Sequence, residues 1–226
     1  PQKSSHFRDT SYFELVAVAV GAKDEEGEIE TGVLFREGDW GIKPTLGTLR
    51  ELDEAPYQMG LGDPEQVLTY NGTRFDEVHL RNWADHADDR LRRRIHSLFD
   101  NHIDLSDEAD GYFKHNGWSL EEVCETAGIE VEETYYEDYD LPQEVIEDKP
   151  DRDQVVTGEH IGNFLGEHYV EAFKQNAGED YKYTRMLPGE YGELQRMIMD
   201  YAKADIKPLF ELYDAIQERK DQQTKL

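Results

Sequence analysis

The feature that most constrains this chain is a carboxylate inside an apolar stripe near its C-terminal end. The apolar pattern predicts a helix over residues 191–203 that continues to about Arg219, and Tyr201 and Asp205 share its apolar face. The same face carries five aliphatic residues: Leu194, Ile198, Leu209, Leu212 and Ile216. An unpaired buried carboxylate costs on the order of several kcal/mol. The fold must therefore place a basic partner, hydrogen-bond donors or a metal ion beside Asp205.

Two further residues refine this prediction. Pro208 lacks the amide that would bond to the carbonyl of Ala204, so the helix is expected to kink or break near Asp205. Lys203 and Lys207 lie nearby in sequence but on other faces of the helix, which makes a salt bridge to Asp205 the weaker explanation.

The order of the predicted elements indicates a mixed α/β domain with an antiparallel hairpin at one side of its sheet. Apolar and β-branched runs predict strands at residues 13–22, 30–35, 65–70 and 101–105. Helices are predicted at residues 48–52, 75–83, 88–99, 119–127 and 159–176. For the helix at 119–127, Ser119 and Glu122 form a capping box and Gly128 supplies the stop.

Length and charge bound the class of protein. A chain of 226 residues with a net charge of −27 has room for one domain, 1–226, and carries strong self-repulsion. The acids are spread over nearly every surface-like segment, which favours a salt-adapted protein whose counterions screen the repulsion; the alternative is an acidic protein that recruits basic partners. Eleven acids and two bases fall in 130–153, which we interpret as an exposed acidic loop or insertion, and 220–226 as a frayed tail.

The cysteine content and the hydropathy exclude further classes. The single cysteine, Cys124, rules out an internal disulfide and a cysteine-based metal cluster. No apolar run is long enough to span a membrane and no signal-peptide pattern is present, so we expect a cytoplasmic protein without a membrane partner.

A second motif, residues 70–76, supplies another aspartate. The strand at 65–70 ends in Asn71-Gly72, a strong turn signal, and the pair Phe75-Asp76 then opens a helix. Taken alone, Asp76 is an ordinary acidic residue at a helix N-terminus, where the dipole favours it.

In this order the motifs resemble the DEDD superfamily of 3′→5′ exonucleases on the ribonuclease-H-like fold, in the variant with a tyrosine in the third motif. The nearest relatives look like the proofreading domain of family B DNA polymerases and its stand-alone relatives. The hairpin at 13–35, the motif at 70–76, the strand and helix at 102–129 and the Tyr201–Asp205 motif carry the resemblance.

The resemblance implies two-metal phosphodiester hydrolysis with Mg²⁺ or Mn²⁺, acting on a single-stranded DNA 3′ end, with replication or repair proteins as possible partners. Asp205 and Asp76 would ligate the metals, and Tyr201 would orient the attacking water. Asn71 and Phe75 would shape the groove around the terminal nucleotide.

One part of the family pattern is absent. The first motif, Asp-x-Glu at the end of the first strand, has no counterpart before Phe13, because Asp9 and Glu14 have the wrong spacing. We expect an N-terminal truncation, with natural loss of the motif as the alternative. Natural loss would make the chain a catalytically silent module that binds nucleic acid or a replication protein.

Two weaker signals remain. The arginine cluster at residues 90–94 is interpreted as a solvated helix face balanced by neighbouring acids, with a phosphate-contacting patch as the functional alternative. Asp104 and His102 are two residues apart on a short strand; we expect Asp104 to be structural, with a site role as the secondary hypothesis.

Overall fold

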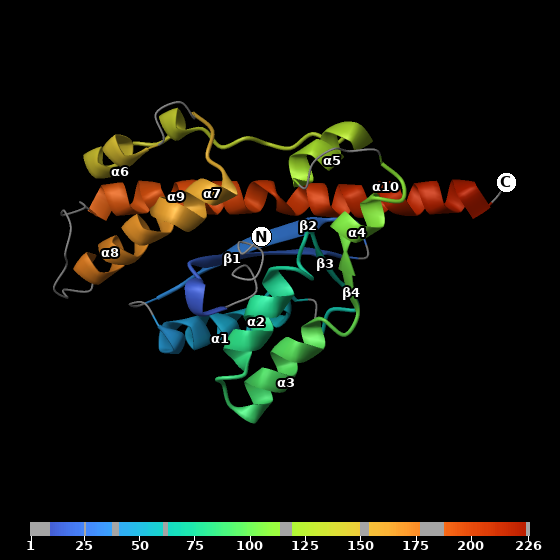
Figure 1. Cartoon of the computed structure of the whole chain (residues 1–226), viewed down its shortest axis with the longest axis horizontal. Helices are drawn as coiled ribbons and strands as arrows, with labels where there is room; N and C mark the ends of the chain where they lie inside the picture. Colours follow the sequence, from blue (N-terminus) through green and yellow to red (C-terminus); the bar gives the residue numbers. More distant parts are fainter. Residues whose placement is uncertain are drawn as a thin grey trace, which may run out of the picture.

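The structure of the chain is a computed structural model that describes residues 10–24, 26–37, 41–60, 63–113, 119–149, 154–176 and 188–224 (Figure 1). Its helices and strands form a mixed α/β arrangement, as the order of the sequence patterns predicts.

The N-terminal strands form the predicted antiparallel hairpin. Strand β1, Ala17–Lys23, pairs with β2, Ile29–Phe35, in a register that runs from Ala17 opposite Phe35 to Lys23 opposite Ile29. Gly27 lies in the connecting turn with φ 91°, a conformation that glycine adopts without strain.

A second pair of strands lies beside the hairpin as a separate sheet. Strand β3, Val67–Thr69, pairs in parallel with β4, His102–Asp104. Parallel strands need a crossover connection, and the two helices α2, Asp76–Ala84, and α3, Asp89–Leu98, provide it. This crossover places the turn after β3 and the end of β4 at the same edge.

The remaining helical segments surround the strands. They are η2, Thr10–Tyr12; α1, Ile42–Gln58; α4, Leu105–Ala109; α5, Leu120–Ala127; η3, Tyr136–Asp138; α6, Gln143–Asp148; α7, Gly158–His160; η4, Ile161–Leu165, which is π-helical; α8, Gly166–Asn176; α9, Pro188–Ala204; and α10, Ile206–Thr224. Helices α9 and α10 run end to end across the molecule, with the strands on one side of them and α5 and α6 on the other; α1, α2 and α3 lie beyond the strands (Figure 1).

Helix α1 is much longer than the five residues predicted around 48–52. Gly47 and Pro56 lower its intrinsic helix propensity, so the sequence pattern understates it. Burial decides the outcome, because Leu49, Leu52 and Ala55 are removed from solvent on the face that meets the hairpin.

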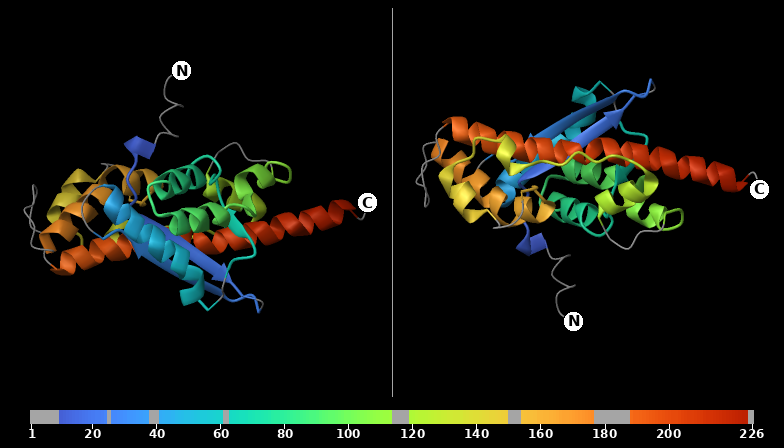
Figure 2. Two further views of the ribbon diagram at one scale, coloured as in Figure 1. Left: turned by 90° about the horizontal axis from the view of Figure 1, so that it is seen from below. Right: turned by 90° about the horizontal axis from the view of Figure 1, so that it is seen from above.

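The C-terminal helix breaks where the sequence predicts it. Helix α9 ends at Ala204 and α10 begins at Ile206, so Asp205 occupies the junction. Helix α10 does not fray after Arg219 as expected, but continues to Thr224 and extends beyond the rest of the fold (Figure 2). Lys220 helps to hold it, through an ion pair with Glu108 of α4 at 2.5 Å.

The acidic segment at 130–153 differs from the expected exposed loop wherever the structure describes it. It contains η3 and α6, and it buries Tyr136, Leu141 and Val145 in one core cluster with α8 and α9. Acids such as Glu132, Glu137 and Glu147 are exposed, while these apolar residues, spaced among them, face the core. Residues 150–153 lie outside the described part of the chain.

A fully buried arginine fixes the connection between β2 and α1. The Arg36 side chain donates to Glu14 Oε2 at 2.8 Å, to the Leu15 carbonyl at 3.1 Å and to the Gly41 carbonyl at 2.9 Å. These acceptors compensate its charge inside the protein.

No helix within the described ranges combines the length and the apolar character that crossing a bilayer requires.

Candidate functional site

The motif at residues 70–76 forms a tight turn that links β3 to α2. Asn71 has φ 59°, in the left-handed region that asparagine tolerates better than most residues. Its carbonyl accepts from the amides of Arg74 at 3.1 Å and Phe75 at 3.2 Å. The turn delivers Asp76 as the first residue of α2, as predicted.

Asp104, at the end of β4, fastens this turn. Its carboxylate accepts from the backbone amide of Asn71 at 2.8 Å and from the amide of Thr73 at 3.0 Å, and also from the Thr73 hydroxyl. It caps α4 as well, accepting from the Ser106 amide at 3.1 Å and the Ser106 hydroxyl at 2.9 Å. These donors lower the pKa of Asp104 despite its burial. Asp104 is therefore a structural residue that positions the motif.

A close approach between the turn and β3 requires glycine at position 72. A Cβ atom there would lie 2.0 Å from Thr69 Oγ1, which is far inside van der Waals contact. The Thr69 hydroxyl is held in place by His102 Nε2 at 2.6 Å, and His102 Nδ1 lies 3.4 Å from Glu77 Oε2. This series of contacts ties α2 to both strands of the parallel pair.

An aromatic cluster surrounds the beginning of α2. The Phe75 ring meets Phe13 at 5.2 Å and His79 at 4.6 Å, both edge to face, and His79 is 1% exposed. Phe75 itself is 38% exposed, which leaves an aromatic surface directly beside Asp76.

Asp76 keeps contact with solvent, yet protein crowds its carboxyl group. This burial, together with the negative charge of Asp104, raises the pKa of Asp76 to about 6. Both causes act in the same direction, so the carboxyl group holds its proton to a higher pH than an ordinary aspartate.

Asp205 lies half-buried at the junction of α9 and α10. Burial and the negative charge of Glu121, in the first turn of α5, raise its pKa to about 6. Within the described ranges no donor contacts its carboxylate, and Lys207 instead pairs with Glu211 at 3.4 Å. Lys207 therefore does not form the salt bridge that could have compensated the charge of Asp205.

Tyr201 lies one turn before Asp205 on α9. Burial and the charge of Asp205 raise the pKa of its phenol, while a hydrogen bond from the Gly158 amide acts in the opposite direction. The Tyr201 hydroxyl is thus oriented by the N-terminus of α7, a contact that no sequence pattern predicts.

Sequence reasoning missed Tyr70, which follows β3. Its hydroxyl is buried and has no hydrogen-bond partner among the residues that the structure describes. Burial raises its pKa to about 12, with further contributions from Cys124 and from carboxylates that include Asp104 and Glu121. Tyr70 therefore lies within electrostatic range of the carboxylates on both sides of the site.

The structure groups the candidate carboxylates into two pairs. Asp76 lies near Asp104, and Asp205 lies near Glu121. Within the described ranges no three His, Cys, Asp or Glu side chains form a group that holds a metal by itself. Mg²⁺, however, is usually bound through one or two carboxylates plus water and substrate phosphates. Asp205, near Glu121, has no hydrogen-bond donor within the described ranges and could take part in such an open site. The Asp104 oxygens already accept hydrogen bonds from Asn71, Thr73 and Ser106.

Two members of the arginine cluster on α3 are engaged in contacts within the protein. Arg94 donates to Asp53 at 2.7 Å and to Asp63 at 2.9 Å, and Arg92 pairs with Asp89 at 2.9 Å. This outcome favours the interpretation of a balanced helix face over a phosphate patch.

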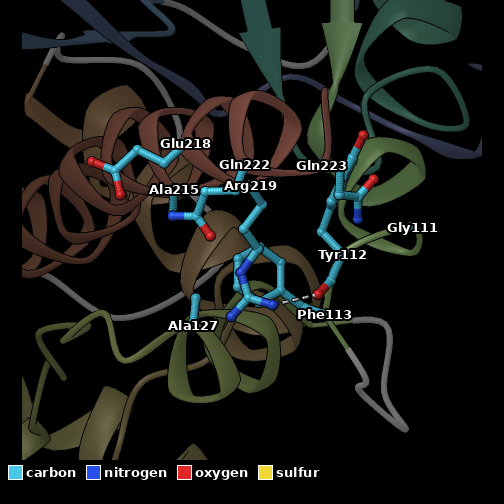
Figure 3. Close-up of a pocket in the computed structure, with 9 residues that line it drawn as sticks. All are labelled: Gly111, Tyr112, Phe113, Ala127, Ala215, Glu218, Arg219, Gln222 and Gln223. Atoms are coloured by element: carbon cyan, nitrogen blue, oxygen red, sulfur yellow. Dashed lines mark hydrogen bonds between the residues drawn. The ribbon is translucent and has the colours of Figure 1, made fainter. Parts of the chain in front are cut away.

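One cavity of ≈ 490 Å³ lies apart from all of these residues, between the turn after α4, the end of α5 and the C-terminal half of α10 (Figure 3). None of the predicted site residues lines it: Asn71, Phe75, Asp76, Tyr201 and Asp205 all lie elsewhere.

Comparison with known proteins assigns no family to the chain. No family model, no curated protein and no solved structure matches it. Its function is therefore argued from the arrangement of its own residues.

Proposed function

We propose that the chain is a 3′→5′ exonuclease domain of the DEDD type, with a ribonuclease-H-like arrangement of its elements, that hydrolyses DNA with Mg²⁺ or Mn²⁺. The antiparallel hairpin, the parallel pair and the order of the motifs along them support the proposal.

The observation that carries the proposal is the placement of two motif aspartates: Asp76 opens α2 near Asp104, and Asp205 lies at the junction of α9 and α10 near Glu121. Asp76 and Asp205 were singled out by sequence motifs, and in the described part of the chain they are the carboxylates whose pKa rises to about 6. A carboxylate that is costly to ionise in the free protein becomes favourable once a divalent cation lies beside it. Two such groups at the two motif positions support the assignment of Asp76 and Asp205 as metal ligands.

Each residue has a distinct task in this mechanism. When bound, the divalent ions supply charge stabilisation to the phosphate and lower the pKa of a bound water. Asp205, supported by Glu121, and Asp76 would hold them. Tyr201, fixed by the Gly158 amide, orients the attacking water, and the exposed face of Phe75 supports the terminal base.

The test is digestion of a labelled single-stranded oligonucleotide at high salt in Mn²⁺, with EDTA as the blank. We expect stepwise shortening from the 3′ end by the wild-type protein and loss of at least about 100-fold in rate in Asp205→Ala and Asp76→Ala, the scale of catalytic groups. Asp221→Ala, an exposed aspartate on the same helix as the junction, is the matched control and should retain the full rate.

Circular dichroism and thermal melting of each variant separate loss of chemistry from loss of fold. A wild-type protein that is folded, binds Mn²⁺ and shortens no oligonucleotide contradicts the proposed activity.

A second candidate function is a catalytically silent module that binds nucleic acid or a replication protein. The absence of a three-ligand metal group among the described residues favours it. It predicts binding of single-stranded DNA that is equal in Mn²⁺ and in EDTA, measured by fluorescence anisotropy, with no product formed in either.

A further inference from the structure

The cavity beside α10 contains an arginine whose side chain is held in one orientation. Arg219 Nη1 donates to the Tyr112 carbonyl at 2.7 Å, and its guanidinium lies 4.1 Å from the centre of the Phe113 ring (Figure 3). Phe113 is 4% exposed and therefore anchored in the core. The hydrogen bond and the cation–π contact together fix the guanidinium across the ring, with its other face toward the cavity.

Two neutral polar side chains form one side of the cavity. Gln222 and Gln223 line it from the last turns of α10, and each carboxamide both donates and accepts hydrogen bonds. Tyr112 is held at the edge by Lys220, whose ammonium lies 6.0 Å from the ring centre. A volume of ≈ 490 Å³ is within the usual range for a small-molecule site.

Charge distinguishes between the ligands that a guanidinium can take. Glu218 also lines the cavity, and the whole chain carries a net charge of −27. Both oppose the capture of a free phosphate. A neutral planar group inside the cavity meets no such repulsion, stacks on a guanidinium plane and presents edge donors and acceptors that carboxamides match. The phosphates of a strand that carries this group stay outside the cavity, where high salt screens their repulsion.

We propose that this cavity binds a nucleobase of a single-stranded nucleic acid, stacked on the outer face of Arg219 and contacted at its edge by Gln222 and Gln223. That the ligand is a single-stranded nucleic acid rests on the proposed function. The cavity is separate from the residues that would bind the metal ions. Arg219 is fourteen residues after Asp205, which places it about 21 Å farther along α10. The base bound there belongs to the strand away from its reacting end.

The experiment compares two fluorescein-labelled oligonucleotides of equal length and charge, one with bases and one fully abasic, by fluorescence anisotropy in EDTA at one high salt concentration. Because phosphates are identical in the two, their difference in affinity isolates the bases. Stacking of a base is worth about fivefold or more in affinity, so wild-type protein should prefer the base-carrying strand by at least that factor.

Two substitutions at one position separate stacking from charge. Arg219→Ala should lower the preference for bases by about fivefold or more, the share that stacking on the guanidinium supplies; the remainder belongs to the terminal base at Phe75. Arg219→Lys should lower it by the same factor, because an ammonium keeps the charge but has no plane on which to stack. Arg92→Ala on α3 removes the same charge from an exposed helix face and should leave the preference unchanged.

If Arg219→Ala loses structure in a melting experiment, the double variant Gln222→Ala/Gln223→Ala takes its place, because both residues are exposed at the helix end. It should weaken the preference for bases by at least about threefold, the effect of losing edge hydrogen bonds. Equal binding of the two strands by the wild-type protein, or a preference that neither Arg219 substitution lowers, overturns the proposal.

The outcomes also separate this proposal from the nuclease. A preference for bases without any digestion supports base binding in the cavity and contradicts the exonuclease activity. Digestion without a preference for bases contradicts only the base binding.

Discussion

Asp104 and Asp205 are two aspartates placed at the start of a helix beside another carboxylate, yet their surroundings have opposite effects. Five hydrogen bonds from the turn at 71–73 and from Ser106 satisfy Asp104, and its pKa is lowered. Asp205 receives no such donors within the described ranges, and its pKa is raised to about 6. Donors, more than burial, therefore decide which of the two carboxylates is structural and which remains available for a ligand.

The two carboxylates also differ in their effect on the stability of the fold. Asp104 joins segments that are distant in sequence, so the position of the 70–76 motif depends on its charge. The Asp205 side chain makes no hydrogen bond to the part of the chain that the structure describes, so the protein tolerates its charge only at a cost. The comparison predicts that removing the first charge weakens the fold and that removing the second strengthens it.

The largest effect is expected for Asp104→Ala. The substitution leaves the amides of Asn71, Thr73 and Ser106 without their acceptor and removes the cap of α4. The free energy of unfolding should fall by about 3–5 kcal/mol in denaturant titrations at high salt.

Asp107→Ala is the matched control for this change. Asp107 is exposed and pairs with Arg74 at 3.2 Å on the surface, so its loss should cost less than about 1 kcal/mol. Equal losses in the two variants would mean that Asp104 does not fasten the turn.

A smaller effect of opposite sign is expected for Asp205→Asn. In the folded protein the carboxyl group has a pKa of about 6, above its ordinary value of 3.8, so the native state binds the proton more tightly than the unfolded state. Stability from this group is full below about pH 4 and is lost as the pH rises to about 6. The loss amounts to at most about 3 kcal/mol, because Asp205 is only partly buried. At pH 7 the asparagine variant should therefore be more stable than the wild type by about 1–3 kcal/mol.

Unfolding titrations at pH 4, 5, 6 and 7 measure this difference. The stability gained by Asp205→Asn should grow between pH 4 and pH 6 and vanish below pH 4, whereas Asp221→Asn, exposed on the same helix, should show no such trend. A gain that does not vary with pH contradicts the assigned cause.

An effect of similar size is expected for a glycine on the Asp104 side of the comparison. Gly72→Ala introduces a Cβ atom 2.0 Å from Thr69 Oγ1, so the turn must shift and stability should fall by about 1–3 kcal/mol. Gly47→Ala serves as the control, because nothing lies within 4 Å of its new Cβ atom and α1 gains helix propensity; thermal melting should show a slight stabilisation. The two glycine substitutions moving in the same direction would exclude steric conflict as the cause.

Local patterns were enough to predict several elements. The hairpin, the break at Asp205 and the cap of α5 follow from short-range rules, and Ser119 Oγ indeed accepts from the Glu122 amide at 3.3 Å. Gly128 ends α5 in the left-handed conformation, as its position predicts. The helix break and the cap depend only on residues within one turn of one another, and the hairpin joins two strands that follow each other in the sequence.

Other features depend on contacts between distant parts of the chain, and the predictions from sequence patterns were wrong for them. The length of α1 and the folding of the acidic segment are decided by burial against elements far along the chain. Tyr70, Glu121 and Gly158 enter the candidate site for the same reason, since no spacing connects them with Asp205 or Tyr201.

The sequence by itself determined that Asp76 opens a helix and that Asp205 belongs to an apolar stripe at a helix break. Only the tertiary structure decided that Asp104 is satisfied, that Asp205 meets Glu121 and that Arg219 lies across Phe113. The reason is physical: helix and turn rules act over a few residues, whereas the ionisation of a carboxyl group depends on every charge and donor that the fold brings within a few ångströms.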